Sequence, residues 1–424
     1  MKTYAAMLVA ALLCDRGLQA QQLARRVASA TGANVEFTYS ARPGICGDGR
    51  TFIRVGTDMY MGRYYNNGGS PCDAGLARVL IVRVDKEPVR VEDYVGPVVH
   101  DPEATDLGRV PAAEAAAYLM QLASGDDGRV ARDAITAAAL ADSTQITSQL
   151  LAIVKDQNKS RELRRNALNW VTRPGLDAGL PVQESIRVLT DIARDENEHQ
   201  SMRQQAASQL GRFERGEGVP ALITMANNES DPWLARQALD GLVRSGDPRA
   251  RRAVREMVSN SKTPDELRSL AIGALVGEYA TFKDADLIRD AYPRLTSDRA
   301  RDAAIIAVAS IGGEHARTWL SDLAKDRDQA MRQRRKAAEQ LSRSGSSSAQ
   351  IGSLYDAVDD VEVRSVLIDV LAQNGTRDAG AKLLSIAKSD PQLPSRRRAI
   401  GALARFEDPT IKNALRDLVE RGAP

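Results

Sequence analysis

The chain has 424 residues, of which 58 are basic and 56 acidic, and its formal net charge at pH 7 is +2. A surface so close to neutral argues against nonspecific binding of nucleic acid or anionic membranes over the whole protein. Only three cysteines and three histidines are present, which leaves few ligands for a metal, and no cofactor is expected.

The first twenty residues have the pattern of a secretory signal peptide. Lys2 precedes an apolar run from Tyr4 to Cys14, and cleavage is expected after Ala20. The apolar run is about eleven residues long, whereas a span of the bilayer needs about 20. We therefore expect export to the periplasm or the extracellular space, with no transmembrane segment. A lipid anchor at Cys14 is disfavoured, because the bulky Leu13 directly precedes it.

Removal of the signal leaves two cysteines, Cys46 and Cys72. An even pair in an exported chain predicts a disulfide. The alternative is a metal site that uses both thiolates, but a structural zinc site needs four ligands and the nearest histidine is His100.

Residues 30–98 differ in chemistry from the rest of the chain and are predicted to form a small β domain tied by the disulfide. The following residues 99–109 are acidic and contain proline, which predicts a linker. Alternating apolar residues and β-rich runs indicate the strands. They comprise Val35, Phe37 and Tyr39, then residues 80–84 and 89–94, the last two joined as a hairpin by residues 85–88.

A loop rich in tyrosine, glycine and asparagine lies between the two cysteines. Its residues Tyr60, Tyr64 and Tyr65 offer rings that could stack on a sugar or a peptide. This alternative would make the protein a glycan- or peptidoglycan-binding protein of the cell envelope. The competing interpretation is that the rings complete a small core or dock on the next domain, and it is favoured because a domain of some 70 residues has little apolar surface to spare.

Residues 110–421 are built from copies of one pattern. Each copy has a leading residue, usually Arg, then Ala three positions later and a larger apolar residue four beyond that, so all three lie on one face of a helix. Most copies are 32 or 33 residues apart, which is typical of stacked repeats and not of a single bundle. The leading positions are 131, 164, 203, 235, 268, 301, 334, 364 and 396.

A second apolar helical segment precedes each of these helices. The sequence therefore predicts a mainly α protein, an α-solenoid of about nine helix pairs. One more helix, Thr410 to Glu420, carries polar residues beside its apolar ones, as expected of a terminal cap.

The repeats resemble HEAT repeats, in the short-repeat group that includes the phycobilisome-lyase-type repeats. This resemblance implies a HEAT-like α–α superhelix in which acidic and basic residues form a ladder between successive repeats. Two copies depart from it, because Ala131 and Ala235 stand where Arg is expected. The lyase activity of some relatives is not implied, since no Cys or His cluster for handling a bilin is present. The residues that carry the resemblance are Asp328 with Arg334, Asp359 with Arg364, and Asp390 with Arg396.

Four arginines are candidates for partner binding. If the leading helices line the inner curve, as the resemblance implies, Arg335 and Arg397 would join the ladder residues Arg334 and Arg396 in a basic strip that faces acidic partners. The alternative is a solvated face whose arginines pair with carboxylates in the turns.

The sequence contains no signature of catalysis. It lacks a Gly-x-Ser-x-Gly elbow, a His-Glu-x-x-His motif, a phosphate-binding glycine loop and an EF-hand loop. We therefore predict an exported, non-catalytic scaffold that binds a protein or peptide partner along the solenoid. A hydrolase with a dispersed active site is the remaining alternative, because catalytic groups need not be close in sequence.

Overall fold

The computed structural model describes residues 21–55, 58–60, 72–125, 127–142, 144–173, 179–228, 230–277 and 280–420. The predicted signal peptide and Cys14 lie outside the described residues. The chain divides into two compact units, one ending at Ala206 and the other beginning at Ala207.

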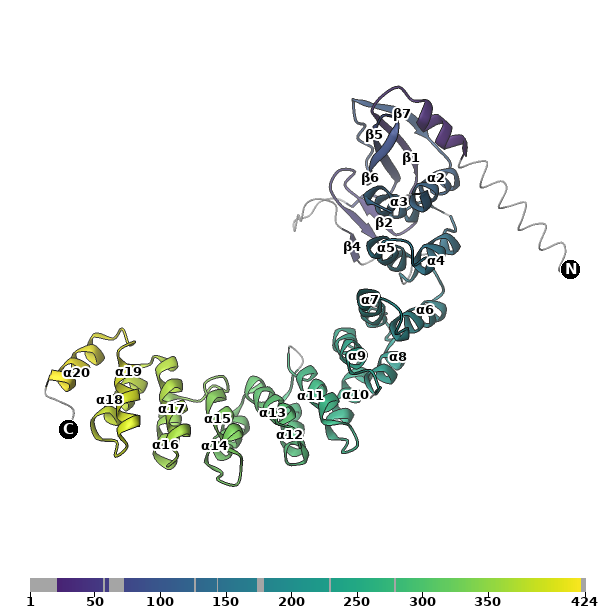
Figure 1. The fold of residues 1–424 in the computed structure, drawn as a ribbon. Helices are drawn as coiled ribbons and strands as arrows, with labels where there is room; N and C mark the ends of the chain where they lie inside the picture. Colours follow the sequence, from purple (N-terminus) through teal and green to yellow (C-terminus); the bar gives the residue numbers. More distant parts are fainter. Residues whose placement is uncertain are drawn as a thin grey trace. The chain divides into compact units, whose positions relative to one another are not determined.

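A four-stranded sheet opens the first unit (Figure 1). Its strand order is β6-β5-β1-β7, with β1 antiparallel to β5, β5 antiparallel to β6, and β7 parallel to β1. A smaller three-stranded sheet has the order β2-β3-β4. The strands are β1 (Asn34–Ser40), β2 (Ile45–Gly47), β3 (Ile53–Val55), β4 (Asp58–Tyr60), β5 (Leu76–Val84), β6 (Glu87–Gly96) and β7 (Ala104–Arg109).

The predicted hairpin is present, with a shorter turn than expected. Strands β5 and β6 are joined by Asp85 and Lys86 alone, whose φ angles are +49° and +67°. Two consecutive residues with positive φ match the right-handed twist of the flanking strands, so the ladder runs almost to the turn. Glu87 and Pro88, which we had placed in the turn, therefore begin β6 at the edge of the sheet.

Residues 21–29 form a helix that was not expected from the sequence. Leu23 and Val27 are its buried apolar residues. The buried Arg83 of β5 donates hydrogen bonds to the carbonyl oxygens of Val27 and Ala30 at the end of this helix. A cation at that position satisfies carbonyl groups that have no partner within the helix.

The predicted linker, residues 99–109, contains a strand. Residues Ala104–Arg109 form β7, which lies beside β1 at the edge of the larger sheet, and Val110 N–H donates to Thr38 O at 2.8 Å. The sequence of this strand has no alternation of apolar residues, because all of its side chains are exposed or half-buried. The β region therefore extends to the start of the first helix pair.

The predicted disulfide between Cys46 of β2 and Cys72 is present, with the two Cα atoms 5.1 Å apart. The turn after Cys46 is organised by Asp48, whose carboxylate accepts hydrogen bonds from the backbone N–H groups of Thr51 and Phe52. Slight burial opposes ionisation of Asp48, but these hydrogen bonds and that from the Thr51 hydroxyl outweigh it and lower its pKa to about 2.

The larger sheet packs directly on the first helix pair, α2 (Ala112–Gly125) and α3 (Arg129–Ala139). The buried Tyr39 hydroxyl donates to Ala137 O at 2.6 Å. The rings of Phe37 and Tyr118 meet edge to face, with centroids 6.4 Å apart. The sheet and the first repeat therefore share one core.

Two carboxyl groups at this junction have raised pKa values. Burial, and then the charge of Asp133 on α3, raise the pKa of Asp93 on β6 to about 7. The pKa of Asp133 is also raised, chiefly by burial, although Arg129 lowers it. Ionisation of Asp93 is therefore unfavourable in the folded protein.

The described residues after the sheet form nine successive helix pairs and a final helix, which confirms the predicted fold class. We call the helix that carries the leading residue of each repeat the leading helix, and it is the second helix of its pair. The remaining pairs are α4 (Thr147–Lys155) with α5 (Arg161–Val171), α6 (Val182–Arg194) with α7 (Gln200–Leu210), α8 (Val219–Ala226) with α9 (Pro232–Ser245), α10 (Pro248–Ser259) with α11 (Asp265–Ala274), α12 (Phe282–Ala291) with α13 (Asp298–Ile311), α14 (Glu314–Lys325) with α15 (Met331–Gln340), α16 (Ser348–Ala357) with α17 (Val361–Asn374), and α18 (Arg377–Ser389) with α19 (Leu393–Leu403); α20 (Pro409–Glu420) follows.

Capping residues explain where these helices begin and end. The side chain of Asp231 accepts a hydrogen bond from Leu234 N–H at the start of α9, and proline follows at the first helical position. The helix ends at Gly246, whose φ of +64° gives the left-handed conformation that commonly ends a helix. Gly375 ends α17 in the same way.

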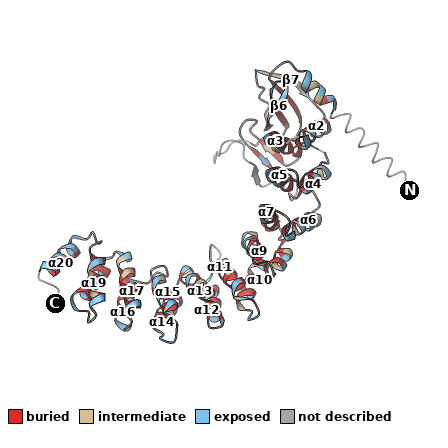
Figure 2. Ribbon diagram, viewed as in Figure 1, coloured by how far each residue is buried: buried red, intermediate tan, exposed pale blue. Residues whose placement is uncertain are grey.

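The second residue of the repeat pattern is buried wherever it is alanine. Figure 2 shows buried residues along the packed faces of the helices in both units. Two backbones approach each other even more closely in the second unit, at Gly211 and Gly241. A Cβ on Gly211 would lie 2.5 Å from Gly241 O. A larger residue there would force two backbones apart. The buried alanines include Ala206, Ala238, Ala271, Ala304, Ala337 and Ala399.

Candidate partner-binding surfaces

The ladder arginines are structural residues of the repeat core. Arg164, Arg203 and Arg334 each donate from Nε to a carbonyl oxygen in the last turn of the preceding helix, at 2.9, 3.0 and 3.1 Å. These carbonyl groups lack helical partners, so the arginine acts as a C-terminal cap for its neighbour. All three arginines are buried.

The remaining nitrogens of the ladder arginines reach the next repeat. Arg334 Nη2 lies 2.5 Å from Asp360 Oδ2, and Arg364 Nη1 lies 3.4 Å from Asp390 Oδ2. Arg164 pairs with Glu198 in the same way. The ladder that the resemblance implied is therefore present between these repeats.

The acidic partners differ from those that stand nearest in sequence. Asp328 precedes Arg334 in its own repeat, yet the carboxylate that meets Arg334 belongs to Asp360 in the following one. Likewise Asp390 meets Arg364 and not Arg396. The buried arginine of one leading helix thus pairs with a carboxylate in the turn that precedes the next leading helix.

Exposed arginines on the leading helices of the second unit pair with carboxylates on the adjacent leading helix. In Figure 1, α13, α15 and α17 lie along one side of this unit. Three ion pairs bridge neighbouring helices: Arg332 with Asp302 at 2.7 Å, Arg335 with Glu362 at 3.2 Å, and Arg398 with Asp369 at 2.5 Å. This side is therefore densely charged and locally balanced in sign.

A groove of about 610 Å³ crosses this charged side. It runs over α15, α17 and α19, and its polar residues sit beside the exposed Val361. Two of the three ion pairs, Arg335 with Glu362 and Arg398 with Asp369, line it, so it presents both carboxylates and guanidinium groups. The lining residues are Arg335, Glu339, Val361, Glu362, Ser365, Val366, Asp369, Val370, Gln373 and Arg398.

The four arginines of the predicted basic strip occupy different environments. Arg334 is only 5% exposed and belongs to the ladder. Arg335 is exposed and lies in the groove, where it pairs with Glu362. Arg396 is half-buried, and Arg397 is exposed without an ion pair to any described residue. Of these four arginines, Arg335 and Arg397 are therefore the two that are exposed to a partner.

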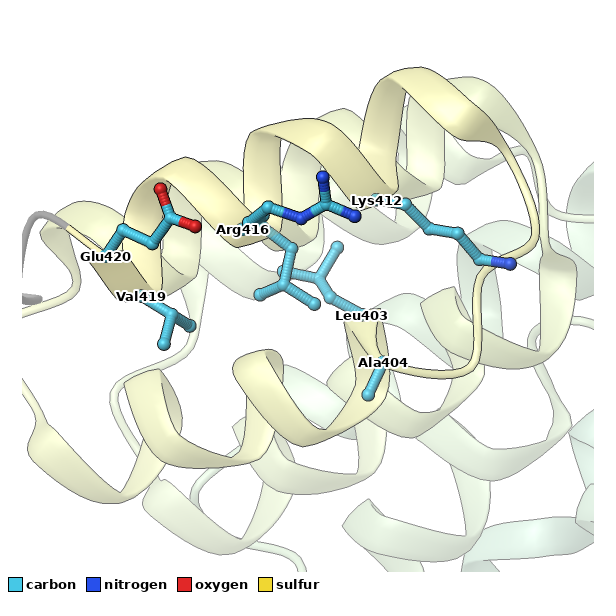
Figure 3. A pocket seen from close by; sticks show the side chains of 7 residues that line it. Leu403, Ala404, Lys412, Arg416, Val419 and Glu420 are labelled. Atoms are coloured by element: carbon cyan, nitrogen blue, oxygen red, sulfur yellow. The ribbon is translucent and has the colours of Figure 1, made fainter.

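A second hollow, of about 380 Å³, lies between α19 and α20 at the end of the described chain (Figure 3). Leu403, Leu415 and Val419 make it mostly apolar, and Val419 is 61% exposed. Lys412, Arg416 and Glu420 lie along the same helix at its rim (Figure 3).

The predicted tyrosine site cannot be assembled from the described residues. Tyr60 is the last residue of β4, paired with Ile53 of β3. Tyr64 and Tyr65 lie outside the described residues. Ligand binding by this loop therefore stays a prediction.

Each of the three histidines has different neighbours. His199 contacts Arg161 Nη1 at 2.6 Å and Ser201, and His315 is 82% exposed with a distance of 4.0 Å to Asp286. His100 meets the buried Glu36, a contact across 64 residues of sequence that no local motif reveals.

No described helix combines the length and the apolar composition that crossing a bilayer requires. The structure thus defines a repeat-helical protein of the α-solenoid class, with a β sheet joined to its first repeat. Residues 186–276 match the family model for HEAT repeats, which confirms the predicted repeat type in that region. None of the curated proteins matches the chain.

Several solved structures resemble the chain at low identity. Human deoxyhypusine hydroxylase in complex with glycerol is 18% identical, over 62% of this chain and 96% of that one, with a TM-score of 0.25. The complex of CpcE and CpcF of phycocyanin lyase from Nostoc sp. PCC7120 is 16% identical, over 66% and 95%, with a TM-score of 0.22. A β-catenin structure from work on its interaction with cadherin is 16% identical, over 67% and 69%, with a TM-score of 0.26.

Proposed function

We propose that this protein is an exported, non-catalytic scaffold that holds a protein or peptide partner along its leading helices. The observation that carries the proposal is the groove over α15, α17 and α19, which three successive repeats build together. A groove made by repeats suits an extended partner, because each repeat contributes one set of contacts at a regular spacing.

The charges in the groove indicate the kind of partner. Arg335 and Arg398 are at the surface but already face carboxylates of the adjacent helix. Exchanging these exposed pairs for pairs with a partner costs little, since a surface ion pair contributes at most about 1 kcal/mol. Arg397 directly precedes the groove residue Arg398 in the sequence and does not line the groove, but it is exposed and has no ion pair with a described residue, so it adds attraction for an acidic segment.

Site-specific photo-crosslinking tests which side of the second unit binds. A photoreactive residue at Gln373, in the groove, should give partner adducts in envelope extract. The same residue at Ser353, exposed on α16, is the matched control and should give none. Adducts at Ser353 alone, or at neither position, would exclude the groove as the binding site.

Charge reversal tests the electrostatic part of the proposal. Arg335→Glu and Arg397→Glu should weaken capture of the crosslinked partner and make it less sensitive to salt. Lys283→Glu, an exposed reversal on α12, should leave capture unchanged. Equal capture by all three variants would remove the role of the basic residues.

Export is supported by the signal-like pattern of residues 1–20 and by the disulfide between Cys46 and Cys72. Sequencing the amino terminus of protein recovered from the periplasm or the medium should give Gln21 as the first residue. An intact amino terminus, with the protein confined to the cytoplasm, would contradict export.

A further inference from the structure

Three side chains from separate parts of the sequence converge beside the edge of the larger sheet. Glu36 lies in β1 and Asp106 in β7, where the two residues are register partners in the parallel pair. His100 belongs to the connection between β6 and β7. The sheet pairing thus fixes the two carboxylates next to each other, and the connection brings the imidazole to them.

The donor atoms of these residues are close enough to share one ion. Glu36, His100 and Asp106 each offer one donor atom, these three atoms lie within 4.8 Å of one another, and His100 Nδ1 is 3.7 Å from Asp106 Oδ2. Ligands of a tetrahedral zinc ion, each about 2.1 Å from the metal, are roughly 3.4 Å apart. A small adjustment of two exposed side chains would complete the arrangement, since His100 is 54% and Asp106 45% exposed.

Glu36 is held in place for such a role. It is only 1% exposed, and its Oε2 accepts hydrogen bonds from Arg78 Nη1 at 3.0 Å and from Asp101 N–H at 3.2 Å. Arg78 is itself fixed, with its guanidinium 4.1 Å from the centre of the Tyr94 ring. One carboxylate oxygen is therefore occupied by orienting groups, and the other is directed toward His100 and Asp106, as the supporting shell of a metal ligand requires.

The local charge also favours a cation. Two carboxylates, those of Glu36 and Asp106, meet at this site, and the guanidinium of Arg78 pairs with Glu36. A doubly charged ion would offset this excess of negative charge. One imidazole nitrogen with two carboxylates, and room for water at the exposed side, is a donor set that suits divalent transition metals such as Zn²⁺.

We propose that Glu36, His100 and Asp106 bind one divalent transition-metal ion. The ion would take the place of the direct contact between His100 and Glu36, with Arg78 and the Asp101 N–H holding the buried carboxylate in position. It would tie the β6–β7 connection to both β1 and β7, directly before the chain enters α2. This assignment is independent of the partner groove, which lies in the other unit.

Titration of the chelator-treated full chain with Zn²⁺, followed by calorimetry, tests the site. We expect one ion per chain and a rise in the melting temperature of the first unit, because a ligand that binds only the folded form stabilises it. Loss of a ligand in His100→Ala or Asp106→Asn should weaken this binding by at least about tenfold. Without metal, Asp106→Asn should melt like the parent, because Asp106 is exposed. His100→Ala also removes the contact with the buried Glu36, so its zinc affinity is the deciding readout and not its melting temperature.

His315→Ala is the matched control, because His315 also faces a carboxylate but has no buried third ligand. It should bind Zn²⁺ as the parent does. Absence of one-to-one binding in the parent would overturn the assignment. Unchanged zinc affinity in His100→Ala or Asp106→Asn would also overturn the assignment. The three residues would then only hold the β6–β7 connection to the sheet by hydrogen bonds.

Discussion

Two adjacent arginines, Arg334 and Arg335, should differ sharply in their contribution to stability. Methionine at either position keeps most of the aliphatic packing and removes the charge and the donors. In Arg334→Met, Ala324 O loses its donor, which costs about 1 to 3 kcal/mol for a buried group. Asp360 also loses its ion pair, but it is 33% exposed and recovers contact with water, so this adds about 1 kcal/mol.

The expected loss for Arg334→Met is therefore about 2 to 4 kcal/mol. For Arg335→Met we expect less than about 1 kcal/mol, because Arg335 and Glu362 are 47% and 59% exposed. Urea unfolding followed by circular dichroism gives the total change. Hydrogen exchange read by mass spectrometry should place the loss of protection in α15 and α17, since repeats are coupled mainly to their neighbours.

A double-mutant cycle isolates the ion pair from the cap. Combining Arg334→Met with Asp360→Asn should cost less than the sum of the two single changes. Similar losses for Arg334→Met and Arg335→Met, both below about 1 kcal/mol, would refute the distinction between a ladder arginine and a surface arginine.

Three further outcomes are expected. Gly211→Ala should destabilise the second unit by about 1 to 3 kcal/mol, because the new Cβ would lie 2.5 Å from a backbone carbonyl oxygen. Gly273→Ala should stabilise it by about 0.5 to 1 kcal/mol, because no atom lies within 4 Å of the new Cβ. Urea titrations of both variants measure these changes. Asp93 has a raised pKa of about 7, so its ionisation destabilises the folded protein progressively as the pH rises from about 4 to about 7. Asp93→Asn should therefore increase the free energy of unfolding by up to about 4 kcal/mol at pH 8, measured as a higher melting temperature, and should change it hardly at all at pH 4. Replacing Cys46 and Cys72 by serine should cost about 3 to 4 kcal/mol for a crosslink with a separation of 26 residues, measured against the parent by thermal unfolding, and no change would argue against loop closure as the source of stability.

Short-range patterns predicted the repeats well. The alanine three positions after the leading residue marks the packed face of a helix, and the larger apolar residue four positions later lies on the same face. Both signals lie within one helix, where spacing in sequence equals spacing on a face. The disulfide could be predicted because a single pair of cysteines remains after residue 20.

Features that depend on contacts between distant segments were not predictable in this way. Strand β7 carries no apolar alternation and exists because β1 offers it an edge. The partner of Arg334 lies in the next repeat, so the carboxylate nearest in sequence is misleading. The meeting of Glu36 with His100 depends on the sheet register, which a single sequence does not specify.

The sheet covers apolar surface of the first helix pair. Because Tyr39 and Phe37 reach into the first helix pair, a shortened protein that starts at residue 110 would begin with an uncovered apolar surface. Any division of this chain for expression, or for fusion to another protein, should therefore keep residues 21–139 together. An insertion in the amino-terminal region should likewise be tolerated only where it leaves the contact between the sheet and the first helix pair intact.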